Sequence, residues 1–445
     1  MPSLIYGPSW SAVAKNLAQR LPLRWFACVT AVKPTFKNDE LAEEHWEREF
    51  EHWIAPFLLE FGYPSQQKWG PIYIRGLLGP GDRKSIEPMA ARVCPGETQQ
   101  LHHFLSTSRW DTAGHECVLL EKAGALVGGK TAHLVIDDTA IPKKGTHSVG
   151  VAHQYCGQLG KNANCQALVS ITLARDEVPV PVALRLYLPK EWAHDPARRR
   201  RAKVPEDVVF RTKWQIALAE VERIVRSGIE FGDVLADAGY GACAAFRRGL
   251  SDLKLRWAVG VNPNQLVYPK SVRVTAPERT RSGGRPPKRG KVSAAPKKAK
   301  EVFSTRAKNG FKDVQWRDGT KGPLSASFAA IRVRVADGPK VIGHNHGPGE
   351  EAWLVCEERA NGVRKYYLSN YPPDTDLGTL ASAIKARWAC EQAHQQMKEE
   401  LGLDHVECRS WHALHHHALL TMMAFAFLQH LRNAEKNAWA QRPAA

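Results

Sequence analysis

This chain of 445 residues carries a formal net charge of +17, and 43% of its residues are hydrophobic. The length predicts two to three domains, or one core with a large insertion, and the apolar fraction suffices to bury that core. Nine cysteines, an odd number without a Cys-x-x-Cys pair, argue against a disulfide framework and a zinc ribbon and fit a reducing compartment.

The positive charge predicts a polyanionic partner, because each Lys or Arg set on a phosphate releases condensed counterions. The alternative is a protein that is basic without such a partner. The N-terminal segment lacks the basic stretch and apolar core of a signal peptide, and the longest apolar stretch, 418–428, is too short to span a bilayer. We therefore expect a soluble, cytoplasmic protein.

The first part of the chain, residues 1–127, is predicted to form a mostly helical domain. The segment 41–61 carries apolar residues at helical spacing among charged ones. Shorter helices are expected at 72–78 and 101–104.

Strand patterns begin after residue 130. HLVIDDTAIP, at 133–142, predicts a buried strand that ends in acidic residues. The elements expected next are strands at 167–174 and 178–188, a helix at 210–227, a strand in VLADAGYG, a helix at 244–253 and a strand at 256–261. The three consecutive strands predict an antiparallel meander, and the whole series has the element order of an RNase H-like fold. We assign residues 128–267 to the first part of such a core.

Residues 268–370 are predicted to form a β-rich insertion. Strand-like runs (FAAIRVRV, EAWLVCEE and RKYYLSNY) surround a stretch, 279–300, that holds nine basic residues and no acid, with Gly and Pro interspersed. This composition predicts a flexible basic loop, in which Arg285, Lys288, Arg289 and Lys291 are candidate DNA contacts. Residues 371–445 are expected to be helical and to complete the core. The fold class is thus α/β, an RNase H-like mixed sheet flanked by helices.

Two acidic residues, Asp137 and Asp237, are each predicted to close a short apolar strand, LVID and VLAD. Either one alone could simply cap a turn or a following helix. Because a sheet brings the ends of adjacent strands together, the two carboxylates could instead share a divalent ion, and hard oxygen ligands select Mg²⁺ or Mn²⁺.

A third acid, Glu391, lies in a predicted helix with Arg387 and Lys398. At 100° per residue, Glu391 and Lys398 project at about 40° and about 20° from Arg387, so all three share one face. Arg387 and Glu391 could also be an ordinary i,i+4 ion pair on a solvated helix. The apolar residues beside this face favour a helix that lies against a core.

These three residues match, without a gap, the Arg-x3-Glu-x6-Lys part of the Tyr-x2-Arg-x3-Glu-x6-Lys signature of bacterial insertion-sequence transposases of the DDE superfamily. Ile384 stands at the Tyr position, which departs from the pattern. The segments VIDDTAIPKKG, VLADAGYG, YLSNYP and YIRGLLGPGDRKSIEPMA also resemble one branch of these enzymes. The resemblance covers about residues 45–430.

The resemblance implies that Asp137, Asp237 and Glu391 are the catalytic acids and hold two Mg²⁺ ions, for which Mn²⁺ substitutes. Asp138 is the rival for the first position. Arg387 and Lys398 are implied to bind DNA phosphates, as a guanidinium fork and a point charge respectively. The enzyme would cut transposon ends and join them to target double-stranded DNA as a homodimer, near the bacterial nucleoid. Residues 1–127 would then serve DNA binding or dimerisation.

Other residues have weaker claims on function. The run His415, His416 and His417 could be a metal site, but consecutive helical positions point in different directions, which favours a structural role. His394 lies one turn after Glu391 and is either near the metals or packed. Trp192 and Trp388 could stack on an extruded base or belong to the core. The basic run 198–201 could grip DNA or form a solvated loop.

Two other functions stay open from the sequence. One is an RNase H-like nuclease or resolvase that is not tied to a transposon. The other is a DNA-binding protein without catalysis. The three intact acids disfavour the second, and the large helical domain and basic insertion disfavour the first.

Overall fold

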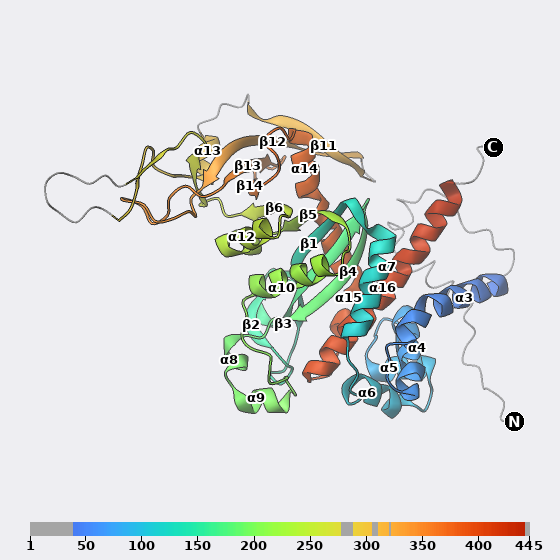
Figure 1. The fold of residues 1–445 in the computed structure, drawn as a ribbon. Helices are drawn as coiled ribbons and strands as arrows, with labels where there is room; N and C mark the ends of the chain where they lie inside the picture. Colours follow the sequence, from blue (N-terminus) through green and yellow to red (C-terminus); the bar gives the residue numbers. More distant parts are fainter. Residues whose placement is uncertain (1–38, 277–287, 305–309, 320–321, 441–445) are drawn as a thin grey trace. The chain divides into compact units, whose positions relative to one another are not determined.

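A computed structural model describes residues 39–276, 288–304, 310–319 and 322–440. The chain divides into two compact units (Figure 1). Unit 1 comprises residues up to 132, 137–231 and from 389 onward, and unit 2 comprises 133–136 and 232–388. Each unit is of the mixed α/β kind, with strands covered by helices, which confirms the predicted fold class.

Of the predicted helical segment 1–127, the described residues 39–127 are helical apart from short connections. Its helices are α3 (Asp39–Leu58), α4 (Pro64–Leu78), α5 (Ile86–Val93), α6 (Thr98–Ser106) and α7 (Ala113–Val127). Pro64 begins α4, where its fixed φ suits the first helical turn and its missing N–H costs nothing. The apolar side chains of α4, among them Tyr73, Ile74 and Leu77, are buried.

The strands of unit 1 are β1 (Gly129–Pro142), β2 (Ala152–Cys156), β3 (Lys161–Arg175) and β4 (Val178–Leu186). β3 lies between β1 and β2 and also pairs with β4 as an antiparallel hairpin. Asp176 and Glu177 turn this hairpin with φ of 48° and 70°, the left-handed pair typical of a tight two-residue turn. The hairpin confirms part of the expected meander, whereas β2 was not expected.

One detail of β1 differs from the prediction. Asp137 does not close the strand but lies within it, because buried Thr139, Ala140 and Ile141 prolong the ladder. The strand ends at Pro142, which has no N–H to donate to a ladder.

The other helices of unit 1 are α8 (Lys190–Ala193), α9 (Pro196–Arg201), α10 (Lys213–Arg226), α15 (Trp388–Glu399) and α16 (Trp411–Ala440), with 3-10 turns at Gly157–Leu159 and Leu403–His405. α10 packs on β3, and α7 and α16 pack on β4 (Figure 1). Thr212 and Gln215 form a capping box that begins α10.

Unit 2 contains β5 (Phe231–Ala236), α11 (Ala238–Gly241), α12 (Ala244–Asp252), β6 (Arg256–Val261), β7 (Leu266–Pro269), β8 (Val274–Thr275), β9 (Lys291–Val292), β10 (Lys297–Lys298), α13 (Ala299–Ser304), β11 (Lys312–Gly319), β12 (Gly322–Val335), β13 (Glu351–Glu358), β14 (Arg364–Ser369) and α14 (Leu377–Ala386). Here β5 lies between the β1 segment 133–136 and β6, to which it runs parallel. β14, β13 and β12 follow β6 as antiparallel strands.

Two predictions about the second half of the chain need correction. Of the basic stretch, residues 288–300 include β9, β10 and the start of α13 rather than a structureless loop, because β10 pairs with β7 and β9 with β8. Residues 279–287, with Arg285, lie outside the described residues. The helix that was expected to carry Arg387 and Glu391 together is divided at Arg387, whose N–H bonds to the Lys385 carbonyl instead of continuing the helix.

No helix within the described ranges is long and apolar enough to cross a membrane.

Candidate active site

Asp137 is a half-buried carboxylate within β1 of unit 1. Its Oδ1 accepts a hydrogen bond of 2.8 Å from the backbone N–H of Asp138, which fixes the side chain against its own strand. Strand alternation sends the adjacent Asp138 to the opposite face. The two neighbouring acids therefore meet different surroundings.

Asp138 forms an ion pair with a lysine of α10. Its Oδ2 lies 2.6 Å from Nζ of Lys213, and both side chains are about one-third exposed. Asp138 thus has a cationic partner in α10, and a carboxylate that neutralises a lysine is a poorer ligand for a divalent ion.

The helix α15 presents a thiol and an imidazole to the strand β3. Cys390 is fully buried, with Sγ 3.3 Å from Oγ1 of Thr172, and His394 is 7% exposed, with Nε2 2.7 Å from Oγ of Ser170. Cys390 and His394 meet because they are one helical turn apart, with Sγ 3.5 Å from Nε2. Ser170 and Thr172 are two residues apart on β3 and therefore point to the same face of the strand. This face meets the face of α15 that carries Cys390 and His394.

The side chains of Cys390 and His394 lie close to Asp137. A carboxylate oxygen of Asp137, Sγ of Cys390 and a ring nitrogen of His394 all lie within 4.8 Å of one another. Such an oxygen, sulfur and nitrogen set can ligate a divalent metal ion. His394 is therefore both buried and close to Asp137.

Glu391 follows Cys390 on α15 and is exposed. At 100° per residue, His394 projects between Cys390 and Glu391, so Glu391 stands at the exposed edge of the face that carries the thiol and the imidazole.

Two half-buried lysines of unit 1, Lys398 and Lys143, have lowered pKa values. The Lys398 Nζ lies 3.4 Å from Oε1 of Gln158, and burial lowers the pKa of Lys398 while the Asp404 carboxylate opposes that change. The Lys143 ammonium donates to the Val406 carbonyl, and burial also lowers the pKa of Lys143. A partly desolvated ammonium interacts more strongly with a phosphate than one in water does.

Asp237 belongs to unit 2, where it directly follows β5, as predicted. Its Oδ1 accepts hydrogen bonds from the N–H groups of Gly239, at 2.9 Å, and Tyr240, at 3.3 Å, so it caps α11. The capping role that its sequence position suggested is therefore real. A carboxylate held in this way still has lone pairs available for a metal ion.

The other candidate DNA contacts are distributed over unit 2. Arg387 is half-buried at the end of α14, and Lys288, Arg289 and Lys291 are exposed. Arg317 stacks on Trp388, with 3.8 Å from Cζ to the ring centroid, so one face of this indole is covered.

Several residues singled out by the sequence have structural roles. Each of the three consecutive histidines has its own partners: His415 the Trp411 carbonyl, His416 the Leu105 and Trp110 carbonyls, and His417 the Tyr73 hydroxyl. Trp192 is 2% exposed and donates to the Val151 carbonyl, which makes it a core residue. In the basic run on α9, Arg199 donates to the Val208 and Pro205 carbonyls.

Sequence reasoning missed Cys390, Lys213 and the hydroxyls of Ser170 and Thr172. A Cys-x3-His pair that brackets Glu391 was the one available signal, since i,i+4 side chains meet on a helix. Lys213 gave none, because its partner Asp138 comes from a distant strand.

Comparison with known proteins gives a family. Residues 56–323 match the model of the DDE superfamily endonucleases, and this range includes Asp137 and Asp237 but ends before Glu391. The chain is 31% identical over 186 residues to a probable transposase for insertion sequence element IS701 from Microchaete diplosiphon, a match over 42% of this chain and 46% of that protein. The match thus spans less than half of that relative. A piggyBac transposase synaptic complex with hairpin DNA, solved by cryo-EM, aligns at a TM-score of 0.42 and 10% identity, covering 83% of this chain and 66% of the other.

Proposed function

We propose, from the premise that this chain belongs to the DDE superfamily of endonucleases, that it is a DNA transposase. It would cut the ends of an insertion sequence and join them to target double-stranded DNA. The supporting observation is the family match over 56–323 together with the cluster of Asp137 and the α15 side chains. The relative from Microchaete diplosiphon, described as a probable transposase, supports the same function.

In this proposal the catalytic acids are Asp137, Asp237 and Glu391, which hold two divalent metal ions. The carboxylate oxygens of these acids suit Mg²⁺ or Mn²⁺. The thiol of Cys390 and the imidazole of His394 are soft or borderline ligands, and both bond to hydroxyls of β3. They suit a positioning role beside Asp137 better than ligation of Mg²⁺.

When bound, the ions supply an activated water or 3′-hydroxyl and neutralise the charge that develops at phosphorus. The protein's own groups bind and orient the DNA around that step. Arg387 offers a planar fork for two phosphate oxygens, and Lys398 a point charge. Ser170 and Thr172 hydrogen-bond to His394 and Cys390, which keeps these two side chains in position beside Asp137.

The remaining parts follow from the same proposal. The helical residues 1–127 bind the element ends or form the homodimer, residues 128–267 and 371–445 make the catalytic core, and 268–370 add a basic, β-rich insertion. Lys288, Arg289 and Lys291, together with Arg285, contact DNA phosphates. Such an enzyme works where the bacterial chromosome is, in the cytoplasm.

The test uses the full chain and duplexes that carry the inverted repeats flanking its gene. Asp237→Asn and Glu391→Gln should each abolish strand cleavage in Mg²⁺ and keep specific binding, because most of the affinity comes from Lys and Arg elsewhere. Glu399→Gln is the matched control, since Glu399 is an exposed acid at the other end of α15. Wild-type cleavage rates in either acid variant would overturn the catalytic assignment.

A further inference from the structure

The helices α4, α5 and α6 of unit 1 form a three-helix cluster in which each helix packs on the other two. Its core is apolar, with Leu77, Met89, Leu101 and Phe104 all 2% exposed or less. Gly76 of α4 allows close packing, because a Cβ there would lie 2.3 Å from Cγ of Met89. The exposed sides of the three helices are therefore available for binding.

A short turn joins α5 to α6. It spans residues 94–97 and contains Gly96 at φ +86°, a backbone conformation that favours glycine. Two helices joined by a three- or four-residue turn with a glycine, packed on a preceding helix, are the elements of a helix-turn-helix. In such motifs the second helix of the pair enters the major groove of DNA.

The exposed face of α6 has the chemistry of a base-reading surface. Gln99, Gln100, His102 and His103 are all exposed, and the segment from Thr98 to Trp110 contains no acidic residue. The side chains of Gln99, Gln100 and His103 make no hydrogen bond to any residue that the structure describes. Their donors and acceptors are thus available to a partner.

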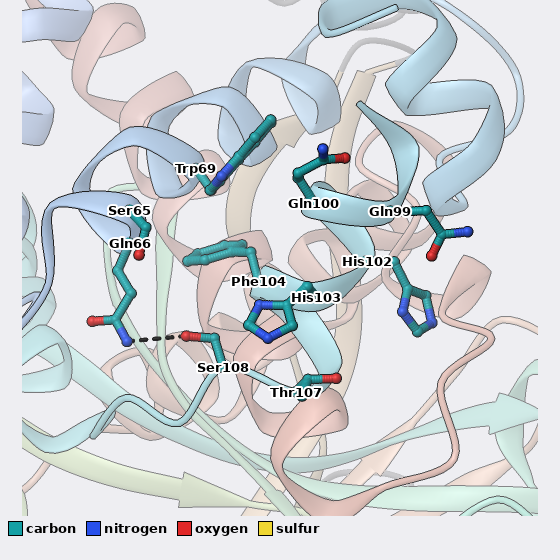
Figure 2. Close-up of a pocket in the computed structure, with 10 residues that line it drawn as sticks. All are labelled: Ser65, Gln66, Trp69, Gln99, Gln100, His102, His103, Phe104, Thr107 and Ser108. Atoms are coloured by element: carbon teal, nitrogen blue, oxygen red, sulfur yellow. Dashed lines mark hydrogen bonds between the residues drawn. The ribbon is translucent and has the colours of Figure 1, made fainter. Parts of the chain in front are cut away.

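A pocket of about 530 Å³ lies beside α6, between it and the start of α4 (Figure 2). Gln66 of α4 donates to Oγ of Ser108 at 3.0 Å, and Trp69 and Phe104 supply the apolar part of the wall. No charged side chain lines the pocket. Amides, hydroxyls and imidazoles match base edges and sugars, whereas phosphate recognition needs cations.

The cations needed for phosphates lie just outside the pocket. Lys68 of α4 is exposed, with Nζ 4.7 Å from the centroid of the Trp69 ring, and Arg109 is exposed just after α6. A face of amides and imidazoles with exposed cations close by in the chain is the arrangement by which proteins contact bases and backbone together.

We propose that α6 reads the base sequence of DNA in the major groove, with Gln99 and Gln100 contacting adenines. A glutamine amide can donate to N7 of adenine and accept from its N6 amino group, a pattern that other base pairs do not present. This inference rests on the proposed transposase function and assigns the recognition of its DNA ends to named residues.

The experiment selects random-sequence duplexes with the full-length wild-type chain and with Gln99→Ala/Gln100→Ala. The wild type should enrich a sequence with one or more fixed adenines, and the double variant should lose that preference while it still binds DNA. On the selected duplex, replacing these adenines by 7-deaza-adenine removes the N7 acceptor and should weaken wild-type binding about 5- to 150-fold, the range for one buried donor left unpaired. It should not weaken binding by the double variant further.

Gln67→Ala is the matched control, because Gln67 is an exposed glutamine of α4 that does not line the pocket. This control should select the same sequence as wild type. If the double variant retains the sequence preference of the wild type, adenines included, this inference is overturned and the transposase proposal stays intact. If the acid variants lose cleavage but the wild type selects no sequence, the transposase proposal stands and the inference about α6 is overturned.

Discussion

The adjacent acids Asp137 and Asp138 show how two like residues acquire different surroundings. One lies within 4.8 Å of a thiol and an imidazole, and the other is paired with Lys213. The difference arises from strand alternation, which turns consecutive side chains to opposite faces. The chemistry of each residue then depends on what packs against its own face.

Asp138→Asn should therefore keep cleavage within about tenfold of wild type, whereas Asp137→Asn should lose about a thousandfold or more, as expected when metal-held charge stabilisation of several kcal/mol is removed. Because the Asp138–Lys213 pair is about one-third exposed, its loss should cost no more than about 1 kcal/mol. Cleavage rates in Mg²⁺ and thermal unfolding measure the two effects. Equal losses in both variants would contradict the assignment.

Cys390 predicts a response to zinc. Its Sγ, the His394 nitrogen and an Asp137 oxygen form a set of donor atoms that suits zinc better than it suits magnesium. Zn²⁺ added to a cleavage reaction in Mg²⁺ should inhibit the wild type at concentrations at least about tenfold lower than it inhibits Cys390→Ser.

The exposed Cys117 of α7 provides the control, because Cys117→Ser changes a thiol away from this cluster. That variant should have the zinc sensitivity of the wild type. Equal inhibition of wild type and Cys390→Ser would show that the thiol does not bind the ion.

At the scale of elements, α16 joins the N-terminal helices through its histidines. His417 accepts from the Tyr73 hydroxyl at 2.8 Å and donates to the Gly402 carbonyl at 3.1 Å, which fits a neutral imidazole protonated at Nε2. Burial lowers the pKa of His417 to about 4, and the Lys143 ammonium acts in the same direction, while the hydrogen bond to the Gly402 carbonyl opposes them. Packing therefore keeps this side chain uncharged.

This depressed pKa makes stability depend on pH. Between pH 6.5 and about 4 the unfolded chain binds a proton at His417 that the folded chain does not, so stability falls as the pH falls through this window. From pH 7 to pH 5, His417 alone should cost about 2 kcal/mol.

Urea unfolding at the two pH values tests this expectation. The loss on acidification should be smaller by about that amount in His417→Gln, which keeps a donor and an acceptor. His52→Gln, at an exposed position of α3, should lose as much as wild type. An unchanged loss in His417→Gln would mean that another group titrates.

At the scale of the whole molecule, the excess of positive charge is the property that most favours DNA as the partner. Lys288, Arg289 and Lys291 are exposed, and β9, which contains Lys291, pairs with β8. Lys291 therefore lies on a strand paired with β8, and Lys288 and Arg289 shortly precede that strand. Their contribution to binding should be independent of sequence, because phosphates carry no sequence information.

Changing these three residues to Gln should weaken binding to all duplexes alike. The slope of log K against log salt should become shallower by up to about 2.7, since each lost phosphate contact contributes about 0.9. A variant with Lys130, Lys161 and Arg226 changed to Gln has the same net charge and alters three exposed residues of unit 1. If both variants change the slope equally, net charge rather than local contact is responsible.

Much of the secondary structure was predictable because its signals are local. The periodicity of α3, the apolar runs of β5, β6, β13 and β14, and Asp237 directly after a strand lie in short stretches of sequence. The spacing of Arg387, Glu391 and Lys398, which carried the family resemblance, is also a local pattern. The break at Arg387 and the continuation of β1 past Asp137 depend on packing and were not predictable.

The sequence by itself thus determined the fold class, the order of the elements and the candidate acids. Only the tertiary structure decided the order of the strands, the pairing of Asp138 with Lys213 and the meeting of Asp137 with Cys390 and His394. The physical reason is that propensity and periodicity act over a few residues. These contacts instead join strands and helices far apart in the chain, and burial of the whole core selects them.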